Sequence, residues 1–198
     1  MAKIITVAHQ KGGVGKSTLA LNLAYRFSKE VKTALTDTDP QGSTMSLQGI
    51  TNDLEIIPYS TIAELRKTAY DIVFIDTPPY LIDTMLPIFI ESDFVLIPTK
   101  AGVPDIMAIG ATVELVKVAQ AKNPNLKAAI VLNMVKPRAS ITEQAKEQLK
   151  EFDLPLLSEV KDRTSYNNTF LTGGVFSSSD KLAQQEIEVL TNEILSYL

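Results

Sequence analysis

A glycine-rich run near the N-terminus constrains this chain more than any other feature. Residues 9–18 read HQKGGVGKST; they follow the β-branched run 4–7 and precede apolar residues at helical spacing between Leu19 and Phe27. A strand, a glycine loop and a helix in this order form the context of a phosphate-binding loop. Its glycines let backbone N–H groups turn towards phosphate oxygens, and the helix N-terminus adds partial positive charge. The run therefore predicts a nucleotide site.

Two side chains of this loop carry the expected chemistry. Lys16 can reach the β- and γ-phosphates, and the Ser17 hydroxyl can ligate Mg²⁺. The loop departs from the G-x-x-x-x-G-K-[ST] pattern, because Gln10 stands at the first glycine position and Lys11 lies inside the loop. A chance glycine-rich turn is the alternative, which the two lysines, the hydroxyl and the flanking elements disfavour. The predicted nucleotide contacts of the loop are Gly12, Gly13, Val14, Gly15, Lys16, Ser17 and Thr18.

The K-G-G-x-G-K-S form of the loop resembles the deviant Walker A motif of the ParA/MinD group of P-loop ATPases. The resemblance covers the whole chain and is strongest to ParA-type partition ATPases of the short ParF-like subgroup. It implies ATP and Mg²⁺ as cofactors, slow ATP hydrolysis without a partner, and a homodimer in the ATP-bound state. It also implies that Lys11 crosses that dimer to the nucleotide of the other subunit, so that Lys11 and Lys16 both act in catalysis.

Acidic residues follow two of the expected strands. The apolar run 72–75 leads to Asp76, which resembles the Walker B carboxylate that holds Mg²⁺, and the residues after it resemble switch II. The segment 36–42, TDTDPQG, resembles switch I of ParA proteins, which implies that Asp39 orients or activates the attacking water and that Asp37 lies near the metal. Phosphoryl transfer depends mainly on such positioning. A capping or turn aspartate at Asp76 and an ordinary Asp-Pro turn at Asp39 are the alternatives.

Two further segments resemble parts of the same family. Asn133 ends an expected strand at the position of the family's base-recognition loop, so its side chain could donate to and accept from adenine. A turn-forming Asn is the alternative, and the sequence leaves ATP against GTP open. The segment 98–105, PTKAGVPD, resembles a proline-containing loop near the dimer interface.

Apolar runs along the chain predict an α/β fold. The β-branched runs alternate with helical spacing, which is typical of βαβ units and a parallel sheet. The run 71–75 is apolar on both faces, which favours a central strand with helices on either side. We therefore predict a doubly wound, mostly parallel sheet with helices on both faces, as in P-loop NTPases. The expected strands are 3–8, 33–37, 55–58, 71–76, 93–98, 127–133 and 155–160, and the expected helices are 16–29, 43–48, 61–69, 105–122, 140–152 and 180–197.

The length of 198 residues favours one domain spanning 1–198. Because the first strand starts by residue 3, we expect neither a signal peptide nor an N-terminal helix-turn-helix domain. No apolar stretch reaches about 18 residues, the length of a membrane span, so we expect a cytoplasmic protein. The family resemblance further implies association with the nucleoid. The stretch 161–179, rich in Ser, Thr, Asn and Gly, is expected to be a long surface loop.

Composition excludes several functions. The chain has no cysteine, so it can hold neither an Fe–S cluster nor the nucleophile of a glutamine amidotransferase. His9 is the only histidine, which excludes a multi-histidine metal site. The final helix carries mainly glutamate on its polar face, which anionic membranes would repel. We expect that helix to pack in the core through an apolar face that includes Leu182 and Leu190.

The family resemblance also implies macromolecular partners. These are a centromere-binding protein of ParB or ParG type, and DNA bound without sequence preference by the ATP-bound dimer. Candidate DNA contacts are Lys136, Arg138, Lys161 and Arg163, each of which could equally be a solvated charge. A formal net charge of −4 argues against strong electrostatic DNA binding, although two subunits could assemble one basic patch.

Three functions remain from these observations. The leading hypothesis is a dimerising ATPase switch that partitions plasmid or chromosomal DNA. The second is an ATPase that positions a protein cargo over the nucleoid. The third, an ATP-dependent carboxylate-activating enzyme related to dethiobiotin or cobyrinate synthases, is disfavoured by the missing amidotransferase cysteine and by the D-x-D-P-Q segment.

Overall fold

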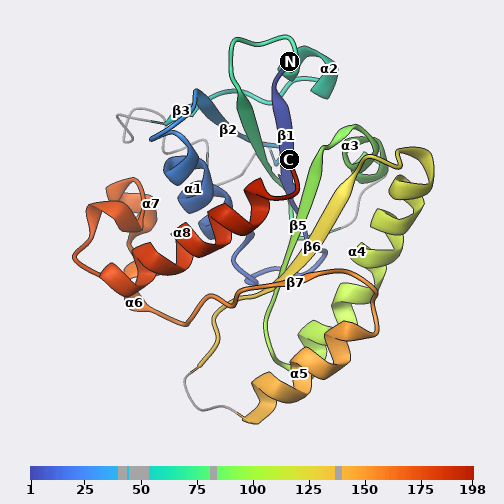
Figure 1. The fold of residues 1–198 in the computed structure, drawn as a ribbon, viewed down its shortest axis with the longest axis vertical. Coiled ribbons are helices and arrows are strands. Elements are labelled where there is room, and N and C mark those ends of the chain that lie inside the picture. Colours follow the sequence, from blue (N-terminus) through green and yellow to red (C-terminus); the bar gives the residue numbers. More distant parts are fainter. Residues whose placement is uncertain (40–43, 45–53, 81–83, 137–139) are drawn as a thin grey trace.

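A seven-stranded parallel sheet forms the middle of the computed structural model, which describes residues 1–39, 44, 54–80, 84–136 and 140–198 (Figure 1). The order of strands across the sheet is β3-β2-β4-β1-β5-β6-β7, and neighbouring strands are parallel. The strands are β1 (Lys3–Val7), β2 (Thr33–Asp37), β3 (Glu55–Ile56), β4 (Ile72–Asp76), β5 (Phe94–Thr99), β6 (Lys127–Leu132) and β7 (Leu156–Leu157). The strands β3 and β7 are shorter than expected because each lies at an edge and pairs on one side.

Helices cover both faces of this sheet. In Figure 1, α1, α7 and α8 lie on one side of the strands, and α3, α4 and α5 lie on the other. The helices are α1 (Lys16–Phe27), α2 (Ile62–Leu65), α3 (Met85–Glu91), α4 (Val103–Lys122), α5 (Ser140–Lys150), α6 (Thr164–Asn167), α7 (Thr169–Thr172), the 3-10 helix η2 (Val175–Ser177) and α8 (Lys181–Leu195). The predicted doubly wound α/β fold is therefore confirmed.

Alternate residues of each strand enter two different cores. In β4, Phe74 packs in the core that contains α1 and α8, whereas Val73 and Ile75 pack in the core that contains α3 and α4. Strand side chains point to opposite faces in turn, so a strand that is covered on both faces must be apolar throughout. This is why the continuous apolar run before Asp76 correctly predicts a central strand.

The register of the central strands brings polar residues to one edge. Parallel pairing aligns Val7 of β1 with Asp76 of β4, and it aligns Asp76 with Asp37 of β2. The chain leaves β1 towards β2 on one side and leaves β4 towards β5 on the other, so the winding changes direction here. Open α/β sheets bind ligands outside the carboxyl ends of their strands at such a point.

The stretch 161–179 is not the surface loop that its composition suggests. It contains α6, α7 and η2, and it buries Tyr166 and Val175 in the core. Each of these helices is about one turn long, so no helical periodicity appears in the sequence. The expectation of an irregular loop was therefore wrong. Packing against α1 and α8 gives this segment a regular structure that its polar composition does not indicate.

Two other helices also differ from the expectation. The helix α3 was not expected, and its sequence contains Pro87, a residue that normally marks a helix break. Here Pro87 lies in the first turn, where backbone N–H groups have no acceptor within the helix. The N–H that proline lacks therefore costs no helical hydrogen bond. The helix expected at 61–69 is reduced to α2, which begins after a capping box formed by Thr61 and Glu64. The helix expected at 43–48 lies outside the described residues, apart from Thr44.

Helix α8 packs one face against the core, as expected. Ile187, Leu190 and Ile194 are fully buried. Leu182 was wrongly placed in that core, because it projects from the side of α8 that faces away from the buried residues, and it is 58% exposed, whereas Ala183 in the same turn is fully buried. Within the described part of the chain, no helix is both long enough and apolar enough to cross a membrane.

Asn22 of α1 links two segments that are far apart in the sequence, which provides a test of the packing. Its Nδ2 donates to the Thr18 carbonyl at 2.7 Å, and its Oδ1 accepts from Val175 N–H at 2.8 Å. Asn22→Ala leaves that buried N–H without an acceptor, so we expect the free energy of unfolding in urea to fall by about 1–3 kcal/mol. Asn192→Ala, at an exposed position of α8, should change it by less than about 0.5 kcal/mol. Equal losses in both variants would contradict this role of Asn22.

Candidate functional site

The glycine loop lies between β1 and α1, at the carboxyl edge of the sheet. Gly13 and Gly15 have φ angles of 73° and 92°, in the left-handed region that favours glycine. A β-carbon on Gly15 would lie 2.1 Å from Nδ2 of Asn133, so no side chain fits there. Such a backbone can turn successive N–H groups towards one anion, and Gly15 is also the N-cap of α1.

Two side chains fasten this loop to the rest of the fold. Asn133, directly after β6, donates from Nδ2 to the Val14 carbonyl at 2.8 Å and is almost completely buried. Gln10, which stands in place of the usual glycine, donates from Nε2 to the Ala108 carbonyl of α4 at 2.5 Å. The observed contact of Asn133 therefore holds the loop, and its contact with a base stays a prediction.

Lys16 is the first residue of α1, and only 6% of its surface is exposed. Its Nζ donates to the Lys11 carbonyl within the loop at 3.2 Å. Burial lowers the pKa of this ammonium, and the charges of Asp76 and Asp37 partly oppose that shift. Among the described residues, the hydrogen bond of this ammonium is to a neutral carbonyl, and a buried cation in this setting favours an anionic ligand, because the anion offsets the loss of hydration.

Asp37 and Asp76 lie side by side at the ends of β2 and β4, and both are almost fully buried. Burial raises the pKa of Asp76 to about 6, a hydrogen bond from Ser17 lowers it, and the charge of Asp37 raises it. Burial also raises the pKa of Asp37. Thr44, which the sequence analysis did not identify, donates from Oγ1 to Asp76 Oδ2 at 3.1 Å. The pair has donors around it, but its two negative charges remain close together.

The donor set fits Mg²⁺ that is bound together with a phosphate ligand. The Ser17 hydroxyl and the carboxylates of Asp37 and Asp76 offer the oxygen ligands that Mg²⁺ prefers. Mg²⁺ usually takes only one or two carboxylates and completes its shell with phosphate oxygens and water. No group of three acidic, histidine or cysteine side chains suited to a metal occurs in the described ranges. Phosphate oxygens of a nucleotide and water would therefore supply the remaining ligands.

Asp39 lies at the wall of the same site. Its N–H donates to Oδ1 of Asp37 at 2.8 Å, which orders the turn after β2. Asp39 therefore stands beside one of the two buried carboxylates, and its role in orienting a water stays a prediction. Residues 40–42 of that motif lie outside the described residues.

An open pocket of about 480 Å³ joins these groups. Part of its wall comes from residues that the sequence analysis did not name as ligand contacts, among them Pro79, Met134 and Phe170. Phe170 belongs to α7, and nothing in the sequence distinguishes it from the other aromatic residues of the stretch 161–179, Tyr166 and Phe176. Met134 has a positive φ of 55°, which is uncommon outside glycine and often marks a functional position. Apolar side chains in the wall of the pocket suit the flat face of a base.

Lys11 forms an ion pair within its own chain. Its Nζ lies 2.7 Å from Oδ1 of Asp105, in the first turn of α4. The same turns of α4 expose Val103 by 54% and Met107 by 78%. The segment 98–105 therefore adjoins the glycine loop, and the two share an edge with exposed apolar side chains.

The four predicted DNA contacts have different surroundings. Lys136 is exposed, and Arg138 lies outside the described residues. Arg163 donates to Glu186 at 2.7 Å, and Lys161 pairs with a neighbouring glutamate. These ion pairs offset the positive charge of Lys161 and Arg163, and a contact of any of the four with DNA stays a prediction.

Comparisons with known proteins agree with this geometry. A family model described as the CobQ/CobB/MinD/ParA nucleotide binding domain matches residues 5–174. Maintenance of carboxysome distribution protein A of Halothiobacillus neapolitanus is 31% identical over 206 aligned positions, which cover 96% of this chain and 95% of that protein. Chromosome partitioning protein ParA of Myxococcus xanthus is 32% identical over 205 positions, which cover 77% of this chain and 72% of that protein.

Solved structures share the fold. Apo McdA of Cyanothece has a TM-score of 0.85 at 17% identity, with 98% of this chain and 100% of that chain covered. A protein described as a plasmid partition protein of Borrelia burgdorferi B31, solved with AMPPNP bound, has a TM-score of 0.80 at 23% identity, with both chains covered completely. At these identities the likeness establishes the fold.

His9 makes the stability of the loop dependent on pH. The ring is 1% exposed, and its Nδ1 accepts the Lys11 N–H at 2.8 Å. Burial, aided by the charge of Lys16, lowers the pKa of His9 from 6.5 to about 4. Between these values the unfolded chain binds the proton and the folded chain does not, so this contribution to stability is lost as the pH falls.

The variant His9→Asn isolates this effect, because Asn can accept the same N–H but does not titrate. We expect the free energy of unfolding of the wild type, relative to the variant, to fall by about 2 kcal/mol between pH 7 and pH 5. Urea unfolding of both proteins at the two pH values measures it, and the comparison cancels the opposite contribution of Asp76. Parallel pH profiles for the two proteins would show that His9 does not titrate in this way.

Proposed function

This chain belongs to the CobQ/CobB/MinD/ParA family of nucleotide-binding domains, and from that membership we propose that it is a dimerising ATPase switch that partitions DNA. The resemblance predicted from the glycine loop is thereby confirmed. The observation that carries the proposal is the buried pair of Asp37 and Asp76 beside that loop, at aligned strand ends. The site thus combines a cradle for phosphates with oxygen ligands for Mg²⁺.

Nucleotide binding replaces contacts that the site makes internally. Lys16 exchanges the loop carbonyl for the β- and γ-phosphates, which provide the anionic partner that its burial calls for. Ser17, Asp37 and Asp76 would hold Mg²⁺, which offsets the negative charge of the phosphates. A bound cation also removes the repulsion between the two carboxylates, so the metal and the nucleotide favour each other's binding.

Hydrolysis needs a water in line with the γ-phosphate, and Asp39 is the residue that we assign to this task. Its backbone is fixed by the bond to Asp37, and its side chain belongs to the pocket wall. Phosphoryl transfer depends more on positioning than on a strong base, so a single oriented carboxylate is sufficient. Slow turnover without a partner is consistent with a switch whose cycle another protein completes.

Dimerisation would use the edge formed by the glycine loop and α4. Lys11 could leave Asp105 because the lysine side chain is 38% exposed, but the carboxylate that it leaves is only 13% exposed, so the nucleotide of the second subunit has to offset the loss of this ion pair. The exposed side chains of Val103 and Met107 on the same edge would be covered by a second subunit. Lys11 could then contact the nucleotide of that subunit, which couples ATP binding to association.

DNA binding by the dimer would depend on a small number of cations. Lys136 is exposed, whereas Lys161 and Arg163 already have acidic partners, so we expect Lys136 to contribute most among the described candidates. A ParB-like or ParG-like protein is the expected centromere-bound partner. Binding to DNA without sequence preference would place the protein on the nucleoid.

Positioning of a protein cargo over the nucleoid is a second candidate function. The carboxysome distribution relative matches this chain nearly from end to end, whereas the Myxococcus ParA match covers about three quarters of it. Both functions need the same ATPase cycle and differ in the partner. A small DNA-binding protein encoded in the adjacent gene would favour partition, and a neighbouring cargo component would favour positioning.

Asp39→Ala tests the assignment of the water-positioning residue. We expect the affinity for a non-hydrolysable ATP analogue, measured by calorimetry, to stay close to that of the wild type. The rate of phosphate release from Mg-ATP should fall by about a hundredfold, because the attacking water loses its orienting carboxylate. Asp162→Ala, at an exposed position, is the matched control. Wild-type turnover in Asp39→Ala would make Asp39 a turn residue only.

Lys11→Ala tests the dimer. We expect the monomer to keep its ATP affinity within about threefold, because Lys16 and the loop backbone still bind the phosphates. The dimer formed with a non-hydrolysable analogue should disappear in sedimentation velocity, and hydrolysis should be lost with it.

The variant Asp105→Asn distinguishes the two roles of Lys11. If Lys11 crosses the interface, releasing it from Asp105 leaves the ATP-dependent dimer intact. If Lys11 only forms the internal ion pair, both variants lose that pair and should behave alike. A stable ATP-dependent dimer of Lys11→Ala would leave this lysine with a local role.

A further inference from the structure

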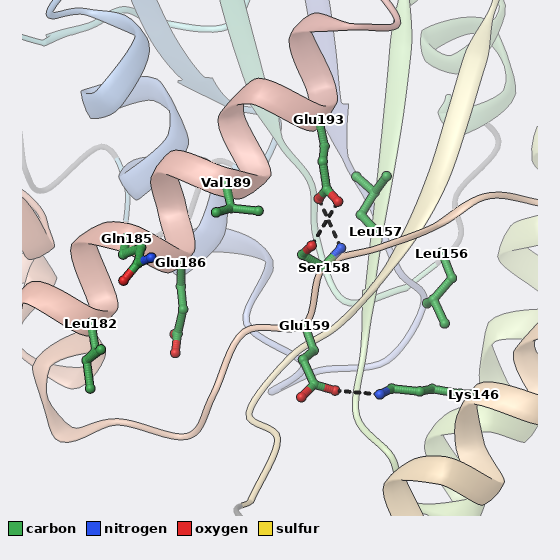
Figure 2. A pocket seen from close by; sticks show the side chains of 10 residues that line it. All are labelled: Lys146, Leu156, Leu157, Ser158, Glu159, Leu182, Gln185, Glu186, Val189 and Glu193. Carbon is green, nitrogen blue, oxygen red and sulfur yellow. Dashed lines mark hydrogen bonds and ion pairs between the residues drawn. The ribbon is translucent and has the colours of Figure 1, made fainter.

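A second hollow lies apart from the nucleotide pocket, between β7 and α8 (Figure 2). It is an open groove of about 630 Å³, and it shares no lining residue with the nucleotide pocket. Helix α8 forms one wall, β7 and the two residues after it form another, and Lys146 of α5 lies at one end. Nucleotide chemistry therefore does not explain this groove.

The α8 wall exposes two apolar side chains that the core does not use. Leu182 and Val189 are 58% and 39% exposed, and their spacing of seven residues, about two turns, places them on one side of the helix. Figure 2 shows both along this wall, with Leu156 of β7 across the groove. Because the opposite side of α8 is buried in the core, folding does not require this second apolar strip. Apolar side chains gathered at a hollow are typical of an interaction surface.

The strand β7 is the last strand of the sheet, and among the residues that the structure describes no strand pairs with its outer edge. On the inner side, the Pro155 carbonyl accepts from Ile130 N–H at 2.8 Å. Because backbone groups of successive residues in a strand point to alternate edges, Leu156 presents its N–H and carbonyl outwards. Ser158 is the next outward residue, and its N–H donates to Oε2 of Glu193 at 2.9 Å. The Glu193 carboxylate thus accepts the N–H that would otherwise donate to a backbone carbonyl of an added strand.

Charge distinguishes Glu193 from the other acidic residues of the groove. Glu159 lies 3.1 Å from Lys146, and Glu186 lies 2.7 Å from Arg163. Glu193 instead accepts from Ser158, and no Lys or Arg of the described residues lies within ion-pair distance of it. The groove therefore places one uncompensated negative charge next to an apolar strip and an open strand edge.

We propose that this groove binds an extended segment of a partner protein in which a Lys or Arg stands between apolar residues. The backbone of the segment adds to the edge of β7 at Leu156, its apolar side chains cover Leu182 and Val189, and its cation pairs with Glu193. This docking does not rest on the proposed partition function. Because the groove and the nucleotide pocket are separate, the partner stays bound in the presence of ADP as well as ATP.

Random twelve-residue peptides displayed on phage test the proposal by selection on the full chain with ADP. We expect the enriched peptides to share a basic residue flanked by apolar residues. A synthetic peptide of that consensus should slow hydrogen–deuterium exchange of the Leu156 amide. The double variant Leu182→Ser, Val189→Ser should weaken its binding about tenfold in fluorescence anisotropy, since both apolar contacts are lost.

Glu193→Gln tests the charge separately from the apolar strip. It should weaken binding of the basic peptide about fivefold, and it should leave unchanged a peptide in which Gln replaces the basic residue. Glu151→Gln, at an exposed position directly after α5, is the matched control and should change neither affinity. Unchanged affinity for Mg-ATP and an unchanged circular dichroism spectrum establish that each variant is folded.

Four results would overturn the proposal. The first is that the enriched peptides bind the Leu182→Ser, Val189→Ser variant as tightly as the wild type. The second is that Mg-ATP displaces them, and the third is that selection on the wild type enriches no peptide that selection on this variant does not. Self-association of the wild type in sedimentation, abolished by the same double variant, would identify a second copy of this chain as the occupant. None of these results depends on whether the chain hydrolyses ATP or binds DNA.

Discussion

Parallel pairing of β4 with both β1 and β2 places Val7, Asp37 and Asp76 in one row at the carboxyl edge of the sheet. Burial there raises the pKa of both carboxyl groups, because it removes the water that would stabilise their charge. Hydrogen bonds from Ser17 and Thr44 and the charge of Lys16 partly offset this shift at Asp76. The carboxylate pair and the glycine loop are therefore one unit, since the charges of each make the burial of the other less costly.

The same loop is connected to distant parts of the fold, which gives nucleotide binding a route to the surface. Gln10 contacts α4, whose first turns carry Asp105 and the exposed Met107. The loop is therefore in direct contact with the helix that carries the edge at which we propose the dimer to form. The groove beside β7 shares no lining residue with the nucleotide pocket, so the docking that we propose there would not depend on the bound nucleotide, unlike the proposed dimer. One fold can serve different functions, because the function depends on individual sites on its surface.

Most of the fold and part of the candidate site could be predicted from local patterns in the sequence. The glycine loop follows from residues 9–18, and the central strand follows from the apolar run before Asp76. Elements that depend on packing were less predictable. The short helices in 161–179 have no periodicity of their own, and α3 has a proline in its first turn. In both cases the contacts with the sheet and its helices decided the structure.

The sequence by itself determined the position of the phosphate loop, the order of the strands and longer helices along the chain, and the acidic residues at the strand ends. These features depend on residues a few positions apart, so a local pattern records them. Only the tertiary structure decided that Asn133 fastens the loop, that Lys11 pairs with Asp105 and that Glu193 caps the edge of β7. The partners in the first of these contacts are 119 residues apart, and in the last they are 35 apart. No local pattern encodes such pairs, because the folding of the sheet brings them together.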